Sequence, residues 1–249
     1  MDNLSAGPQR RRHDLTDWLR LHGLDAKSCL RILDTIQKED AGSAAPQVPQ
    51  QVSAPINLDT AWLTVARAIQ DLLPGHRELV ENTFEKTAKI MVSRKGNARK
   101  ALTIDKGPSA YPAICYSYTG VAADLLIMAH EFGHAVQIRA SGGKFMPPAL
   151  REVCAFLGER ALLKSASAGD SSLYAELVRS WQVDDQSYLR KGDKLRKALA
   201  RPDTPYDYAW NYPIARHVAS RAFDQCSPEW TSRIFAGELA LPEVLEACC

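Results

Sequence analysis

The most informative stretch of this chain is LLIMAHEFGHAV, residues 125–136. At its centre, His130, Glu131 and His134 form an H-E-x-x-H sequence inside an otherwise apolar run. Residues four apart lie on one face of an α-helix, so both imidazoles can bind one zinc ion while Glu131 reaches a water molecule on it. The alternative is a chance match, but buried polar side chains need partners, which a metal ion supplies. The stretch therefore predicts a buried helix with a site for metal-assisted hydrolysis.

A catalytic zinc ion also needs a third protein ligand, and Glu152 is the best candidate. Pro147-Pro148 marks the start of a second helix, and Glu152 falls in its first turn. Glu159 follows two helical turns later, nearly on the same face. The alternative interpretation places both glutamates on a solvated surface, with Arg151 and Arg160 as neighbours.

These segments together resemble a known family. The stretch AYPAICYSYTG (residues 110–120), then Asp124, the histidine segment and the Glu152–Glu159 pair, is similar to the catalytic core of the M3 oligopeptidases, which include thimet oligopeptidase and oligoendopeptidase F. The resemblance covers residues 98–225 and is far more specific than H-E-x-x-H alone.

The resemblance implies a role for each matching residue. The zinc ligands would be His130, His134 and Glu152, with Glu131 as the general base. Asp124 and Glu159 would orient the histidines through hydrogen bonds.

A later aromatic segment, PYDYAWNYP (residues 205–213), lies where the family places tyrosines that face the zinc ion and donate hydrogen bonds to the oxyanion. Counting back from Phe223, Tyr212 matches best and Tyr208 second. The alternative is a packed aromatic cluster, because Pro213 can shift the helical register.

The chain departs from the family in three respects. Gln137 stands where the family usually has a further histidine, and the connection between His134 and Glu152 is short. Family members are also much longer, and their extra helical domain walls a deep channel that this sequence does not provide. The site of this chain is therefore expected to be more open.

Composition limits the possible functions. The chain has 249 residues, 45% of them hydrophobic and 24% charged, and a formal net charge of +2, which argues against a nucleic-acid-binding surface. No apolar stretch is long enough to span a membrane, and no secretory signal is recognisable, so we expect a cytoplasmic protein, with leaderless export as an option. The six cysteines show no C-x-x-C spacing and are expected to be free thiols.

The sequence predicts three parts. Residues 1–40 would form a disordered tail and a small helical hairpin, residues 41–55 a flexible linker, and residues 56–249 the zinc metallopeptidase domain. The hairpin would either pack against the main domain or dock a partner.

Within the main domain, apolar spacing predicts helices over 60–73 and 76–92, short strands over 101–104 and 113–118, and a long helix over 171–200 that is interrupted near Asp184. We expect residues near Tyr111–Tyr118 to form an edge strand that binds the substrate backbone as an added strand.

Together these features predict a mainly α protein with a small β-sheet (α+β), built on a zincin-like metallopeptidase core whose active-site helix carries HEFGH. The predicted function is a zinc-dependent endopeptidase acting on peptides or a protein segment, with a zinc-activated water molecule and Glu131 as general base. Two alternatives stay open: a zinc-containing binding protein without turnover, and a protease targeted by a partner, such as an exported effector. Glu131 favours an active enzyme, because a binding protein needs no base there.

Overall fold

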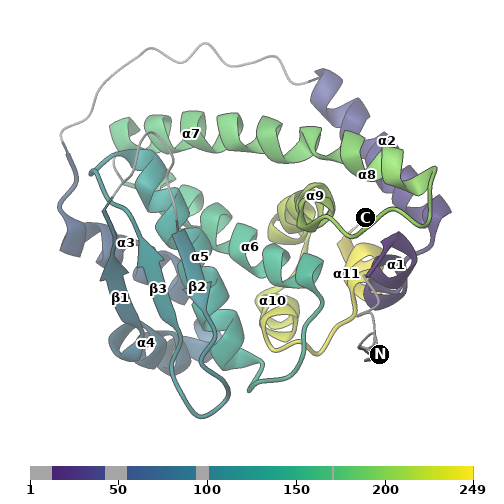
Figure 1. The fold of residues 1–249 in the computed structure, drawn as a ribbon. Coiled ribbons are helices and arrows are strands. Elements are labelled where there is room, and N and C mark those ends of the chain that lie inside the picture. The colour runs from purple at the N-terminus through teal and green to yellow at the C-terminus, as the bar shows by residue number, and fades with distance from the viewer. Residues whose placement is uncertain (1–12, 43–54, 94–100, 170, 249) are drawn as a thin grey trace, which may run out of the picture.

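Helices dominate the computed structural model, which describes residues 13–42, 55–93, 101–169 and 171–248 (Figure 1). The long helices are α2 (Ala26–Gly42), α3 (Leu58–Leu72), α5 (Ala122–Ala140), α6 (Pro148–Ser167), α7 (Ser171–Arg190) and α9 (Asn211–Gln225). The shorter ones are α1 (Leu15–His22), α4 (Arg77–Lys86), α8 (Gly192–Leu199), α10 (Pro228–Phe235) and α11 (Leu241–Cys248), with 3₁₀ turns η1 (Pro74–His76) and η2 (Tyr208–Trp210). A small sheet lies at one side, so the fold is mainly α with a small β-sheet, as predicted.

The sheet has three strands, β1 (Ala88–Met91), β2 (Ala101–Ile104) and β3 (Ala113–Tyr116), in the order β1-β3-β2. β1 runs parallel to β3, and β2 runs antiparallel to it. β3 is therefore the central strand, and the expectation that residues near Tyr111–Tyr118 form a substrate-binding edge strand is wrong. The edge strand that packs against α5 is β2.

α5 and α6 pack against each other in the centre of the molecule (Figure 1). Two glycines allow their backbones to approach closely. A Cβ atom at Gly133 would lie 2.9 Å from Cα of Ala155, and one at Gly158 would lie 2.7 Å from the carbonyl oxygen of Ala129. Because Gly133 belongs to the HEFGH segment and Gly158 precedes Glu159, this contact joins the two predicted halves of the metal site.

The N-terminal hairpin packs on the C-terminal helices. α2 contacts α8 and α9, and Figure 1 shows α1 beside α11. Trp18 donates a hydrogen bond from Nε1 to Oδ1 of Asn211 at 2.8 Å, and Nδ1 of His217 lies 3.2 Å from Oε2 of Glu39. The hairpin also contributes to the main buried core through Leu15, Trp18, Cys29, Leu33 and Ile36. Packing against the main body, one of the two expected roles, is therefore what the structure shows, and docking of a partner stays a prediction.

Two predicted helices have different ends in the structure. The helix expected over 76–92 ends at Lys86, and residues 88–91 instead pair with the central strand as β1. The helix expected over 171–200 breaks at Lys191, between α7 and α8, rather than near Asp184. In both places tertiary packing, rather than local periodicity, decides where the helix ends.

Three other expectations have mixed outcomes. The predicted tail and most of the predicted linker lie outside the described residues. Cys29, Cys115 and Cys154 are free thiols, whereas Cys226 is disulfide-bonded, so the expectation of free thiols throughout is wrong. Among the helices that can be described, none is long and apolar enough to cross a membrane.

Candidate metal centre

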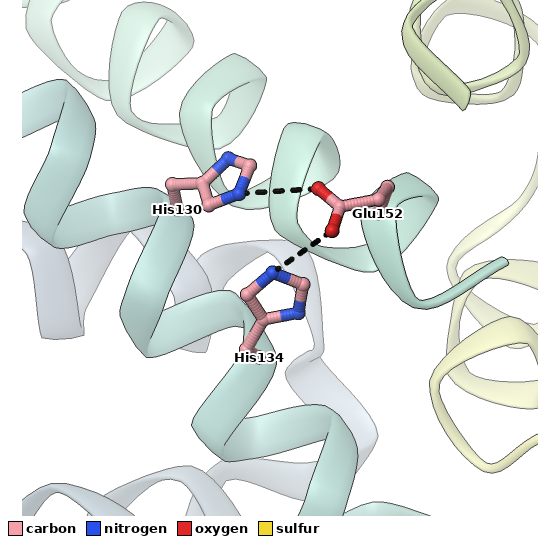
Figure 2. Close-up of side chains that lie close together, drawn as sticks. All are labelled: His130, His134 and Glu152. Atoms are coloured by element: carbon pink, nitrogen blue, oxygen red, sulfur yellow. Dashed lines mark ion pairs between the residues drawn. The ribbon is translucent and has the colours of Figure 1, made fainter. Parts of the chain in front are cut away.

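α5 places His130 and His134 one turn apart on the side that faces α6, with ring centroids 4.9 Å apart (Figure 2). Their side chains are 13% and 11% exposed. Glu131, between them in the sequence, is also buried. The helix therefore presents two largely buried imidazoles toward α6.

Glu152 approaches these histidines from the first turn of α6, as Figure 2 shows. Its Oε2 lies 3.3 Å from Nε2 of His130, and its Oε1 lies 3.7 Å from Nε2 of His134. One ligand atom from each residue lies within 4.8 Å of the other two. The structure thus brings together the three side chains predicted as zinc ligands.

The cluster fits a zinc ion. Oε2 of Glu152 is buried and has no hydrogen-bond partner among the residues that the structure describes, although Nε2 of His130 is close to it. A buried carboxylate oxygen without a partner is costly, and a cation between it and the two Nε2 atoms would remove that cost. Two histidines and one glutamate also form a donor set typical of catalytic zinc sites.

The two histidines differ in their protonation in the metal-free protein. Burial lowers the pKa of His134 to about 4, which keeps its ring neutral and able to bind a cation. Burial also opposes a charge on His130, but Glu152 and Glu159 outweigh it and raise the pKa of His130 well above its ordinary value. A metal ion bound at this group would therefore displace a proton from His130.

Glu159 holds His130 from behind. Nδ1 of His130 lies 2.8 Å from Oε1 of Glu159, which leaves Nε2 facing Glu152. The other oxygen of Glu159 accepts a hydrogen bond from Nη1 of Arg216 at 2.5 Å, and Arg216 Nε donates to Asp185 at 2.8 Å. Burial opposes ionisation of Glu159, but Arg216 and His130 outweigh it and lower its pKa.

Both glutamates of α6 are therefore interior residues. Glu152 is 3% exposed and Glu159 is 4% exposed. The alternative that placed them on a solvated surface beside Arg151 and Arg160 is wrong, and the partner of Arg160 is Asp224.

Glu131 is contacted by the sheet. The hydroxyl oxygen of Thr103, on β2, lies 2.8 Å from Oε2 of Glu131. Burial raises the pKa of Glu131, although His130 and the Thr103 bond oppose the rise. A raised carboxyl pKa suits proton acceptance and return near neutral pH.

The two candidate tyrosines lie differently. Tyr208 donates a hydrogen bond from its hydroxyl to Oε1 of Glu152 at 2.6 Å. The Tyr212 ring packs 5.0 Å from the ring of Tyr188, and Nζ of Lys191 lies 4.1 Å from the Tyr212 ring centroid. Burial raises the pKa of both phenols, so each keeps its proton. The structure thus connects Tyr208 directly to the cluster, and Tyr212 to an aromatic group beside it.

Asp124 is used differently from the expectation. Its Oδ2 accepts hydrogen bonds from the backbone N–H and the hydroxyl of Thr119, both at 2.7 Å, and from the N–H of Val121 at 3.3 Å. These bonds fix the start of α5, two turns before the histidines. The expected hydrogen bond to a histidine is not observed, since Nδ1 of His130 faces Glu159 and Nδ1 of His134 has no hydrogen-bond partner in the described part of the chain. Asp124 therefore supports the site through the helix rather than by direct contact.

Comparison with known proteins places the fold. No family model matches the sequence, and no curated protein matches it at a significant level. A structure described as an oligoendopeptidase F from Bacillus anthracis str. Ames matches with a TM-score of 0.56 at 14% identity, covering 94% of this chain and 51% of that one. A structure described as a peptidase from Chlamydophila abortus matches with a TM-score of 0.55 at 14% identity, covering 94% of this chain and 43% of that one.

This chain has the fold of these peptidases. The likeness confirms, at the level of the fold alone, the resemblance to oligopeptidases that the sequence predicts. The chain spans about half the length of the first structure, where the match covers 51%, and less of the second.

Sequence reasoning missed two residues that touch the site. Arg216 lies in the apolar helical run IARHVA (residues 214–219), where a lone arginine is a signal for a buried partner. Thr103 is the polar residue of a short strand whose neighbours Leu102 and Ile104 are apolar. Neither signal names the partner, because Glu159 and Glu131 lie far away in the sequence.

Proposed function

We propose that this protein is a zinc-dependent endopeptidase. The observation that carries the proposal is the meeting of His130, His134 and Glu152 within 4.8 Å, with Glu131 on the same helix as the histidines. This donor set and a neighbouring carboxylate are what metal-assisted peptide hydrolysis requires. The likeness of the fold to peptidase structures supports the same activity.

His130, His134 and Glu152 would hold the ion, which when bound supplies Lewis-acid polarisation of a carbonyl and lowers the pKa of a water molecule. Glu131 takes a proton from the attacking water as general base. The same carboxyl group then returns the proton to the amine of the departing peptide, so no second acid is needed. Burial, which raises the pKa of Glu131, favours this return.

Tyr208 is the better candidate for stabilising the oxyanion. Its hydroxyl already lies at the cluster, 2.6 Å from Oε1 of Glu152, and its raised pKa keeps it a donor. When a peptide carbonyl enters, the hydroxyl would turn from Glu152 toward the oxygen on which negative charge develops. Tyr212, whose ring centroid lies 5.7 Å from that of Tyr208, is the second candidate.

β2 is the element best placed to bind the peptide backbone. It forms an edge of the sheet, because among the described strands only β3 pairs with it. An extended peptide can add to such an edge through main-chain hydrogen bonds, which give affinity with little sequence preference. Peptides or an extended protein segment are therefore the proposed substrates.

The test combines zinc analysis with cleavage of a quenched fluorescent peptide library by wild type, Glu131→Gln and Glu152→Ala. We expect one zinc ion per chain in wild type and Glu131→Gln, and less in Glu152→Ala. Cleavage should fall about 10²- to 10⁴-fold in Glu131→Gln, because general base catalysis is lost while the ligands stay.

Other results would redirect the proposal. Zinc in the wild type without cleavage would favour the binding protein without turnover, or an enzyme that requires a partner. A wild-type protein that takes up no zinc would refute the proposal as a whole.

A further inference from the structure

The Thr103 hydroxyl is bonded to Glu131 in two ways. Its oxygen lies 2.8 Å from the carboxylate Oε2 of Glu131 and 2.8 Å from the backbone carbonyl oxygen of the same residue. A hydroxyl has one hydrogen, so it donates to one of these acceptors at a time. The carboxylate is the stronger acceptor, because a hydrogen bond to an ionised group is about twice as strong as one between neutral groups.

The sheet holds Thr103 rigidly in this position. Thr103 pairs with Ile114 of the central strand, and Ile114 is completely buried. Side chains alternate along a strand, so Leu102 and Ile104, which are 51% and 42% exposed, point away from α5 while Thr103 points toward it. The hydroxyl therefore reaches Glu131 from a backbone whose register is fixed.

The geometry points to Thr103 as the positioning residue of the general base, an inference that rests on the proposed peptidase function. By engaging Oε2, the hydroxyl fixes the rotation of the Glu131 carboxylate and leaves Oε1 to meet the water. Thr103 also lies on β2, the strand proposed to bind the substrate backbone. One strand thus places the peptide and orients the base that acts on it, which keeps the two in mutual register.

A purely structural role makes different predictions. If Thr103 only tied β2 to α5, loss of its hydroxyl would loosen the strand and raise KM or lower zinc content. If it positions the base, kcat should fall while KM and zinc content stay unchanged, because the water is activated less often in the productive geometry.

Three variants separate these roles. Thr103→Val keeps the shape and the strand propensity but removes the hydroxyl, and Thr103→Ser keeps the hydroxyl. Thr64→Val is the matched control, because it removes an exposed hydroxyl on α3 that donates to the carbonyl oxygen of Thr60. We expect kcat to fall about 10- to 100-fold in Thr103→Val, and to stay within about twofold of wild type in Thr103→Ser and Thr64→Val.

A second measurement does not depend on activity. In metal-free protein labelled with ¹³C on glutamate side chains, the Cδ resonance of Glu131, assigned with Glu131→Gln, should shift in Thr103→Val and stay in place in Thr103→Ser. An unshifted resonance in Thr103→Val would overturn the inference even if wild type does not cleave peptides. A kcat equal to wild type in an active Thr103→Val enzyme would overturn it too, while leaving the proposed function intact.

Discussion

The two sides of the candidate metal site are built in different ways. On the histidine side, His130 and His134 come from one helix, and four-residue spacing alone puts them on the same face. On the glutamate side, Glu152 is bonded to Tyr208, 56 residues away in the sequence. The first side follows from local geometry, whereas the second exists only when distant parts of the chain have folded together.

The glutamate side depends on the N-terminal hairpin as well. α6 begins at Pro147 and Pro148 with no capping side chain of its own. Instead, Nε2 of His22 accepts a hydrogen bond at 3.1 Å from the backbone N–H of Ala149, three residues before Glu152. A residue from the hairpin thus performs the work of a helix cap, which local residues usually perform.

A second bond links the hairpin to Tyr208. Trp18 donates to Oδ1 of Asn211 at 2.8 Å, and Nδ2 of Asn211 donates to the carbonyl oxygen of Tyr208 at 2.9 Å. α1 therefore fixes both the start of α6 and Tyr208, the two features that position Glu152. Substitutions on the histidine side should act through buried charge, whereas substitutions on the glutamate side should act through hydrogen bonds between residues far apart in the sequence.

The largest effect is expected from Arg216→Met, which removes the charge that supports the histidine side. Arg216 is 1% exposed, and its loss leaves the buried carboxylate of Glu159 with His130 as its remaining charged partner. Breaking a buried ion pair in this way costs about 3–5 kcal/mol. The free energy of unfolding of the metal-free protein, measured with urea, should fall by that amount.

Two comparisons make this test specific. Arg160→Met breaks the more exposed pair with Asp224 and should cost about 0–1 kcal/mol. Adding Glu159→Gln to Arg216→Met removes the stranded charge and should recover part of the loss. Equal costs for Arg216→Met and Arg160→Met would contradict the view that the histidine side depends on buried charge.

Tyr208→Phe breaks the glutamate side with a smaller expected effect. If Tyr208 donates to the oxyanion, its loss should lower kcat by about 10²- to 10³-fold. Since its hydroxyl also bonds Glu152, the dissociation constant for zinc should rise about tenfold, as for other groups that orient a metal ligand. Steady-state kinetics and zinc competition measure the two effects separately.

Tyr212→Phe is the matched control. Its ring packs against Tyr188 and Phe156, and this packing survives loss of the hydroxyl. We expect kcat to change by less than about threefold, the size of an ordinary packing effect. A larger loss in Tyr212→Phe than in Tyr208→Phe would assign the oxyanion to Tyr212, the better match in sequence.

The same contrast explains how far the sequence could predict the structure. Spacing within one or two helices was enough to predict the histidine helix, the helix start at Pro148, and the placement of Glu152 and Glu159 on one side of the second helix. The structure contains all three. The strand over 101–104 was also predictable, because its own residues are enough to indicate a strand.

The predictions that failed concern residues whose partners lie far away in the sequence. The strand order β1-β3-β2 is a property of the sheet, and nothing local marks β3 as its centre. Residues 88–91 read as the end of a helix until pairing with β3 draws them into the sheet. The bonds of Thr103 and Arg216 to the site span 28 and 57 positions, so a residue type hints at a partner without identifying it.

The smallest expected effect concerns His22 and depends on pH. Its Nδ1 lies 2.7 Å from the carbonyl oxygen of Trp18, so the neutral ring donates there and accepts from Ala149 at Nε2. Burial lowers the pKa of His22, and the hydrogen bond to Trp18 opposes this shift. Protonation would also turn Nε2 into a donor that faces the N–H of Ala149, so the cap requires the neutral ring.

The sign of the pH effect follows from this lowered pKa. Below about pH 6.5, the ordinary histidine value, the unfolded chain takes up a proton at His22 that the folded protein resists. The contribution of His22 to stability is therefore complete above that pH and declines as the pH falls toward the lower pKa of the folded state. His22→Leu should lose the cap at neutral pH, at a cost of about 1 kcal/mol, and should remove this part of the pH dependence.

Urea unfolding of metal-free wild type and His22→Leu at pH 7.5 and pH 5.5 measures both effects, and the difference between the two proteins cancels the titration of the other histidines. His76→Leu, at an exposed position on the surface, is the control substitution. If wild type and His22→Leu lose the same stability between the two pH values, His22 does not act as the neutral cap of α6. Zinc titration of His22→Leu at pH 7.5 then shows whether the cap acts on the ligand: weaker binding would mean that the hairpin holds Glu152 in place through the first turn of α6.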